Sequence, residues 1–114
     1  MELKNSETLQ NLMRAFAGES QARNRYTFAA EVCRQQKLQV LEAVFLFTAG
    51  QEKEHAEIFY NHMREITGGS VQIDGGYPVD LTHDVAELLR SAQVSSRGMT
   101  ALYLGILVVL SMVN

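Results

Sequence analysis

The chain has 114 residues and a mass of 12.8 kDa, enough for one small domain and too little for two with separate cores. A net charge of -3 and a pI near 5.5 exclude strong electrostatic binding to nucleic acid or to an anionic membrane. The single cysteine excludes an intrachain disulfide framework and is compatible with the cytoplasm, where we expect the protein to work.

Three helices are predicted in chain order. Residues 6–36 hold one glycine and no proline, and their apolar positions recur at helical spacing; a break around 37–39 separates them from a second periodic run, residues 40–66. Residues 67–80 contain two Gly-Gly pairs and the only proline, which predicts a loop. Asp80 or Thr82 can cap a third helix that runs to about residue 93. The predicted fold class is all-α: a helical hairpin, half of a four-helix bundle, followed by a third helix and an apolar tail.

In each long helix, polar residues occupy positions on the core-facing stripe where the helical period predicts apolar residues. Glu19 lies on the stripe of the first helix, and Glu52 and His55 lie on that of the second. Buried, uncompensated carboxylates cost several kcal/mol, roughly. A shared divalent cation would compensate both carboxylates, and Glu-x-x-His places two ligands on one helix face. Carboxylate and imidazole ligands suit iron, manganese or zinc, and a carboxylate-rich set favours iron or manganese.

Two simpler interpretations compete with a metal site. Arg23 lies four residues after Glu19, so the pair can form an ordinary ion pair within the helix. A helix boundary misplaced by one residue would also move these side chains off the core face. Tyr26 lies two turns after Glu19 on the same face, and if Glu19 binds metal we expect the Tyr26 hydroxyl to hydrogen-bond to its carboxylate. His62 is predicted to be a partly buried residue at the edge of the core.

Two segments carry a family resemblance. FAGESQARNRY at residues 16–26 and EKEHA at residues 52–56 resemble the first half of the rubrerythrins, which belong to the ferritin-like superfamily. The resemblance covers residues 3 to about 93. It implies a di-iron carboxylate protein that reduces hydrogen peroxide, in defence against oxidative stress. By motif, Glu19 and His55 match metal ligands, Glu52 matches the carboxylate that bridges the metals, and Tyr26 matches a tyrosine beside the centre; Glu52 and Tyr26 are thus the expected catalytic residues.

The resemblance also implies ligands that this sequence lacks. Residues 93–98 read QVSSRG where the family pattern has a further Gly-Glu segment, and a second Glu-x-x-His element and a rubredoxin module are absent. Residues 1–93 are therefore interpreted as a partial di-iron domain. A homodimer would bring two copies of Glu19, Glu52 and His55 together, with electrons supplied by a separate rubredoxin-like protein. The alternatives are an iron-binding or ferroxidase half-ferritin module and an inactive truncated remnant.

Residues 94–114 form an atypical tail. Every Lys, Arg, Asp and Glu lies at or before Arg97, and 12 of the 15 residues from 99 to 113 are apolar. This run is shorter than the roughly 20 residues that cross a bilayer, which argues against a membrane anchor. A helix in the seam of the bundle is a second interpretation. We favour a third, a frameshift or gene truncation, because the ferritin-like pattern stops where the tail begins.

Overall fold

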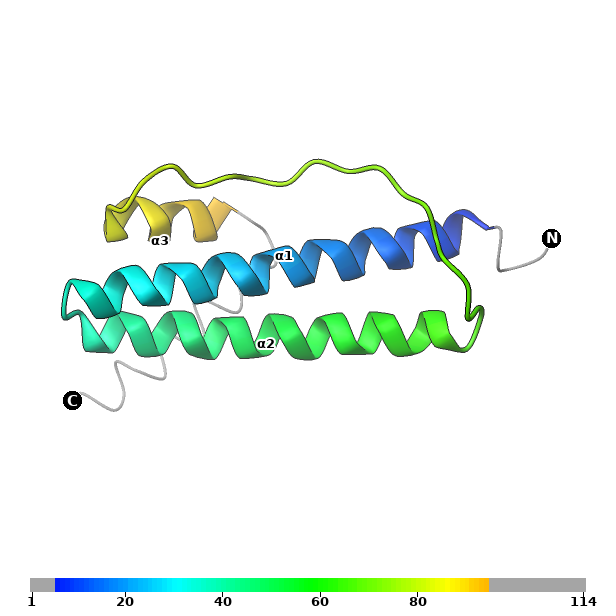
Figure 1. The fold of residues 1–114 in the computed structure, drawn as a ribbon, viewed down its shortest axis with the longest axis horizontal. Coiled ribbons are helices and arrows are strands. Elements are labelled where there is room, and N and C mark those ends of the chain that lie inside the picture. Colours follow the sequence, from blue (N-terminus) through cyan, green and yellow to red (C-terminus); the bar gives the residue numbers. More distant parts are fainter. Residues whose placement is uncertain (1–5, 95–114) are drawn as a thin grey trace.

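The computed structural model describes residues 6–94, and within that range the protein consists of helices and their connections, without strands. Helix α1 spans Glu7–Gln35, α2 spans Gln39–Arg64 and α3 spans Val85–Val94. Figure 1 shows α1 and α2 side by side as a hairpin, with a long crossover that runs back along α1 to α3. The all-helical hairpin is confirmed, while the predictions for the tail fall outside the described residues. None of the helices between residues 6 and 94 combines the length and apolar character needed to cross a bilayer.

The two long helices have well-defined ends. The Ser6 side chain accepts a hydrogen bond from the backbone N–H of Leu9 and so caps the start of α1. At the other end, Lys37 takes a left-handed backbone conformation with φ 62°, which terminates α1. The N–H of Leu38 then donates to the carbonyl of Cys33 over 2.9 Å. The predicted break around 37–39 is confirmed, and it is short enough to make α1 and α2 antiparallel neighbours.

The core lies between α1, α2 and α3. Its buried side chains include Tyr26 and Cys33 from α1, Val44 and Phe45 from α2, and Leu88 from α3. The stripe predicted for α2 drifts from the observed one after Glu52: the buried residues continue through Ala56 and Met63, whereas the prediction stepped to His55 and His62. Each helical step is 100°, so a choice one residue early rotates the predicted face toward solvent. The prediction of a partly buried His62 is therefore wrong; His62 is exposed.

The third helix is capped by Asp84, not by Asp80 or Thr82 as predicted. The Asp84 carboxylate accepts a hydrogen bond from the N–H of Ala86 over 2.9 Å. The hydroxyl of Thr82, two residues before Asp84, accepts one from the N–H of Asp84. Asp80 has another role, because its carboxylate accepts hydrogen bonds from Arg25 of α1 and Ser91 of α3. A single aspartate thus ties the end of the crossover to both helices.

The Arg25–Asp80 pair is much better shielded than the other crossover pair, Arg14–Asp74. The Arg25 and Asp80 side chains are 14% and 21% exposed, against 38% and 97% for Arg14 and Asp74. Burial acts to raise the pKa of Asp80, but the hydrogen bonds from Arg25 and Ser91 and the charge of Arg25 outweigh it and leave the pKa lowered. The Arg25–Asp80–Ser91 cluster is therefore the clamp that holds the crossover and α3 on α1.

We expect Asp80→Asn to lower the free energy of unfolding by about 1–3 kcal/mol at neutral pH, the usual worth of a hydrogen bond to a charged group. Because folding lowers the pKa of Asp80, this stabilisation is present above the unfolded carboxyl pKa of about 4 and is lost as the pH falls through the folded value. Urea unfolding of the metal-free protein at neutral and acid pH measures it. Asp74→Asn is the matched control and should change stability little. An equal effect of both variants at neutral pH would refute the clamp.

Candidate metal centre

The hairpin brings the three predicted ligands together. Glu19 comes from the middle of α1, and Glu52 and His55 lie one turn apart on the adjacent stretch of α2. His55 Nδ1 lies 3.6 Å from Glu19 Oε2 and 3.9 Å from Glu52 Oε2. One ligand atom from each residue lies within 4.8 Å of the others, a spacing that one metal ion can bridge. Among residues 6–94, this is the group of three whose geometry could hold a metal.

Both carboxylates are withdrawn from solvent. Glu19 is 3% exposed and Glu52 is 1% exposed, although glutamate side chains are seldom fully buried. Glu52 Oε1 is buried and finds no hydrogen-bond partner in the described part of the chain. An ionised carboxylate in such a place is costly unless a cation or hydrogen bonds compensate it. A divalent cation between α1 and α2 would compensate both carboxylates at once.

His55 occupies the edge of the site, not its interior. Its side chain is 46% exposed, because three residues after Glu52 the helix has turned the imidazole to the border of the buried face. The competing interpretation of Glu19 depended on Arg23. Arg23 is exposed, and its guanidinium donates to Asn24. The imidazole of His55, with one face toward solvent, is thus the basic group that the geometry places beside both carboxylates.

Tyr26 is buried beside the site but does not make the predicted hydrogen bond. Its hydroxyl has no hydrogen-bond partner among residues 6–94, and its ring lies 6.3 Å from that of Phe45. Burial raises the pKa of Tyr26, the charge of Arg25 lowers it, and the negative charges of Glu19 and Asp80 raise it further. The phenol therefore keeps its proton at neutral pH and has an uncommitted O–H donor.

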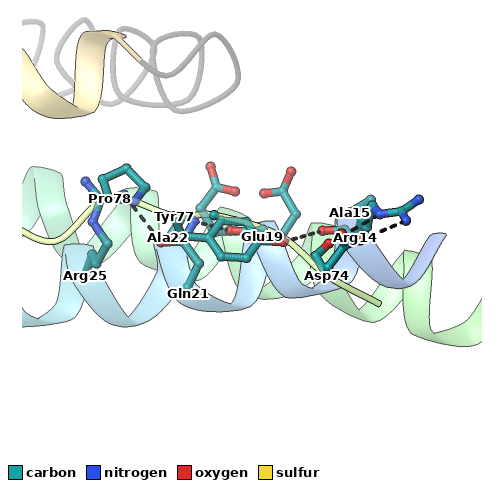
Figure 2. Close-up of a pocket in the computed structure, with 13 residues that line it drawn as sticks. Arg14, Ala15, Glu19, Gln21, Ala22, Arg25, Asp74, Tyr77 and Pro78 are labelled. Carbon is teal, nitrogen blue, oxygen red and sulfur yellow. Dashed lines mark hydrogen bonds and ion pairs between the residues drawn. The ribbon is translucent and has the colours of Figure 1, made fainter. Parts of the chain in front are cut away.

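A hollow beside the carboxylates was not predicted from the sequence. It has a volume of about 500 Å³, and its lining includes Glu19, Glu52, Gly18 of α1 and Tyr77 of the crossover. Figure 2 shows Tyr77 and Pro78 over the labelled residues of α1. A sequence signal existed: a glycine inside a long helix often marks the close approach of another segment. The Tyr77 ring lies 3.7 Å from the place where a Cβ on Gly18 would stand.

The sequence matches one family model and several curated proteins. The model described as rubrerythrin matches residues 10–93. The rubrerythrin of Porphyromonas gingivalis is 43% identical over 90 residues, which cover 79% of this chain and 44% of that protein. The rubrerythrin of Clostridium perfringens is 42% identical over 91 residues, covering 79% and 47%. The rubrerythrin of Nitratidesulfovibrio vulgaris is 35% identical over 102 residues, covering 89% and 52%.

These matches agree with the geometry of the site. The chain spans about half the length of the relatives it matches. No solved structure matches it significantly. The family match covers α1 from residue 10 onward, α2, the crossover and nearly all of α3, including Glu19, Glu52 and His55. The chain therefore belongs to the rubrerythrin family.

Proposed function

We propose that the chain contributes half of a di-iron centre that reduces hydrogen peroxide, and that a second copy of the chain contributes the other half. The observation that carries the proposal is the convergence of Glu19, Glu52 and His55 on one point, with both carboxylates buried. Membership of the rubrerythrin family supports iron as the metal. We propose that the protein works in the cytoplasm and takes its electrons from a separate rubredoxin-like protein.

The donor set fits iron. Two carboxylates and one imidazole are the hard and borderline ligands that iron and manganese take in carboxylate-rich sites. The buried Oε1 of Glu52 has a lone pair without a partner in the described residues, so Glu52 would have an oxygen available to hold the metal. Iron would supply reversible one-electron chemistry at each metal, which a protein of ordinary side chains lacks.

The chain's own residues would position the peroxide and manage its protons. Peroxide reduction breaks the O–O bond with two electrons and two protons and releases two water molecules. The Tyr26 phenol is protonated and its O–H is uncommitted, so we assign it the role of a hydrogen-bond donor to the oxygen that gains negative charge. Glu52 would hold the iron beside the bound peroxide, and its carboxylate would balance part of the positive charge of the centre.

The second copy is inferred from what the described residues leave incomplete. A four-helix di-iron site uses a Glu from each of two helices and a Glu-x-x-His from each of the other two, and residues 6–94 hold one of each. Next to His55, α2 bears an apolar stripe of Val40, Phe47 and Ile58, residues that are 42–54% exposed. These positions are 7 and 11 residues apart and so share one line along the helix. A second hairpin packed on the stripe would cover His55 and supply the missing ligands.

Glu52→Gln tests the ligand assignment, because the amide keeps the shape of the side chain and loses the charge. Removing a group that merely orients a ligand lowers metal affinity by about 10–100-fold, so removing a ligand should lower it more. Fe²⁺ titration under anaerobic conditions, with helix content checked by circular dichroism, measures the change. Glu57→Gln, an exposed change on the same helix, is the control. Unchanged iron binding in folded Glu52→Gln would remove Glu52 from the site.

Reaction of the reduced iron-loaded protein with hydrogen peroxide tests the function. We expect one iron per chain in a dimer, and faster reoxidation by peroxide than by oxygen at equal concentration, measured by stopped-flow absorbance. Faster reoxidation by oxygen, with iron accumulating beyond two per dimer, would support the ferroxidase alternative instead. Metal-free aggregates would support the inactive remnant.

Phe47→Lys tests the second copy. A lysine in the centre of the apolar stripe should separate the dimer and remove the paired iron, because its charge would have to be buried at the interface. Leu46→Lys is the matched control, since residue 46 is 50% exposed, against 42% for Phe47, but points about 100° away around α2. Analytical ultracentrifugation with iron analysis measures both. A monomer that binds two irons per chain, or a Phe47→Lys dimer with its iron intact, contradicts the assignment.

A further inference from the structure

The two sides of the carboxylate pair differ in their surroundings. On one side stands His55, whose half-exposed ring adjoins the apolar stripe that the proposed second copy would cover. The 500 Å³ hollow reaches Glu19 and Glu52 from beneath the crossover, and His55 is not part of its lining. If the function proposed above is correct, the second copy would cover His55, and the hollow would remain as the place where small molecules reach the metals.

Tyr77 is the aromatic side chain of the crossover in the lining of the hollow, and it is 42% exposed. Its hydroxyl donates to the backbone carbonyl of Arg14 over 3.2 Å, and Figure 2 shows the two residues. Its ring lies 3.7 Å from the place where a Cβ on Gly18, one residue before Glu19, would stand. The absence of a side chain on Gly75 leaves room for the Tyr77 hydroxyl, because a Cβ on residue 75 would stand 3.2 Å from it. One exposed hydrogen bond and contacts with glycines hold the ring, so it can swing away without disturbing the core.

The charges at the rim favour small solutes without a strong net charge. The two arginines that line the hollow are already neutralised, Arg14 by Asp74 and Arg25 by Asp80. A free anion would compete with these aspartates and would meet the carboxylates at the floor. A neutral molecule of the size of hydrogen peroxide meets neither penalty, and a divalent cation is attracted by Glu19 and Glu52.

We propose that the hollow is the access route to Glu19 and Glu52, for the metal during assembly and for peroxide during turnover, and that Tyr77 is its gate. The gate acts on the rates of entry and release, because a solute passes only after the ring has moved aside. The affinity of Glu19 and Glu52 for metal is unchanged. In this role Tyr77 does not contact the metal-binding oxygens of Glu19 and Glu52. It controls the passage of solutes and is not a catalytic residue.

Co²⁺ binding to the metal-free protein tests the gate without any catalytic readout. Stopped-flow absorbance of the cobalt bands gives the uptake rate, and trapping released Co²⁺ with excess EDTA gives the release rate. Tyr77→Ala should raise both rates several-fold and leave the cobalt stoichiometry and affinity unchanged. Tyr77→Phe, which keeps the ring and loses the bond to Arg14, should fall between the two. Tyr60→Ala is the matched control, because this half-exposed tyrosine packs on Phe16 and lines a different hollow.

Each outcome decides between the proposals. Equal rates in the wild type, Tyr77→Ala and Tyr60→Ala would overturn the gate and place metal access on the His55 side. A change in affinity as large as the change in rate would also overturn it, since that marks damage to the site. Accelerated cobalt exchange in Tyr77→Ala, together with no peroxide reduction by the iron-loaded wild type, would refute the proposed function and leave the access route standing.

Discussion

The burial of two carboxylates inside a two-helix hairpin is the constraint on which the rest of this structure depends. Glu19 and Glu52 face each other across α1 and α2 with almost no exposure to water, in positions that leucine or isoleucine would fill at no electrostatic cost. Burying two ionised carboxylates side by side opposes folding, because each loses its hydration and the two repel each other. Such a pair is consistent with a cation in the assembled protein. The cation would offset the cost of burying the two carboxylates and would link α1 to α2.

The remaining structure holds this pair in place and limits access to it. The left-handed turn at Lys37 fixes the register of α1 against α2, and therefore sets Glu19 opposite Glu52 and His55. The Arg25–Asp80–Ser91 clamp keeps the crossover on α1, where the Tyr77 ring lies beside the carboxylates. The apolar stripe beside His55 faces outward, as an interface with a second copy would require. The candidate ligands, the crossover that covers them and the exposed stripe thus lie close together on the hairpin.

Much of this arrangement could be predicted from the sequence, because helical period and capping are local properties. The two long helices, the break near residue 37, the Gly-rich crossover and the core positions of Glu19 and Glu52 follow from spacing and composition. His55 was placed deeper than it lies, since a one-residue choice changes direction by 100° around the helix. The Asp80 clamp and the position of Tyr77 over Gly18 join residues more than 50 positions apart, and no local pattern encodes such contacts. The hydrogen bond predicted between Tyr26 and Glu19 is not made. Residues seven positions apart share a face of the helix, but about two helical turns separate them.

The central claim is that two Glu19–Glu52–His55 groups combine into one di-iron centre. Mössbauer spectroscopy of the protein loaded with isotopically enriched iron and oxidised to the ferric state tests it most directly, because bridged ferric ions couple and isolated ones do not. We predict a diamagnetic ground state at low temperature, with iron bound one per chain. A magnetically split spectrum of isolated high-spin ferric ions at the same loading would contradict the account.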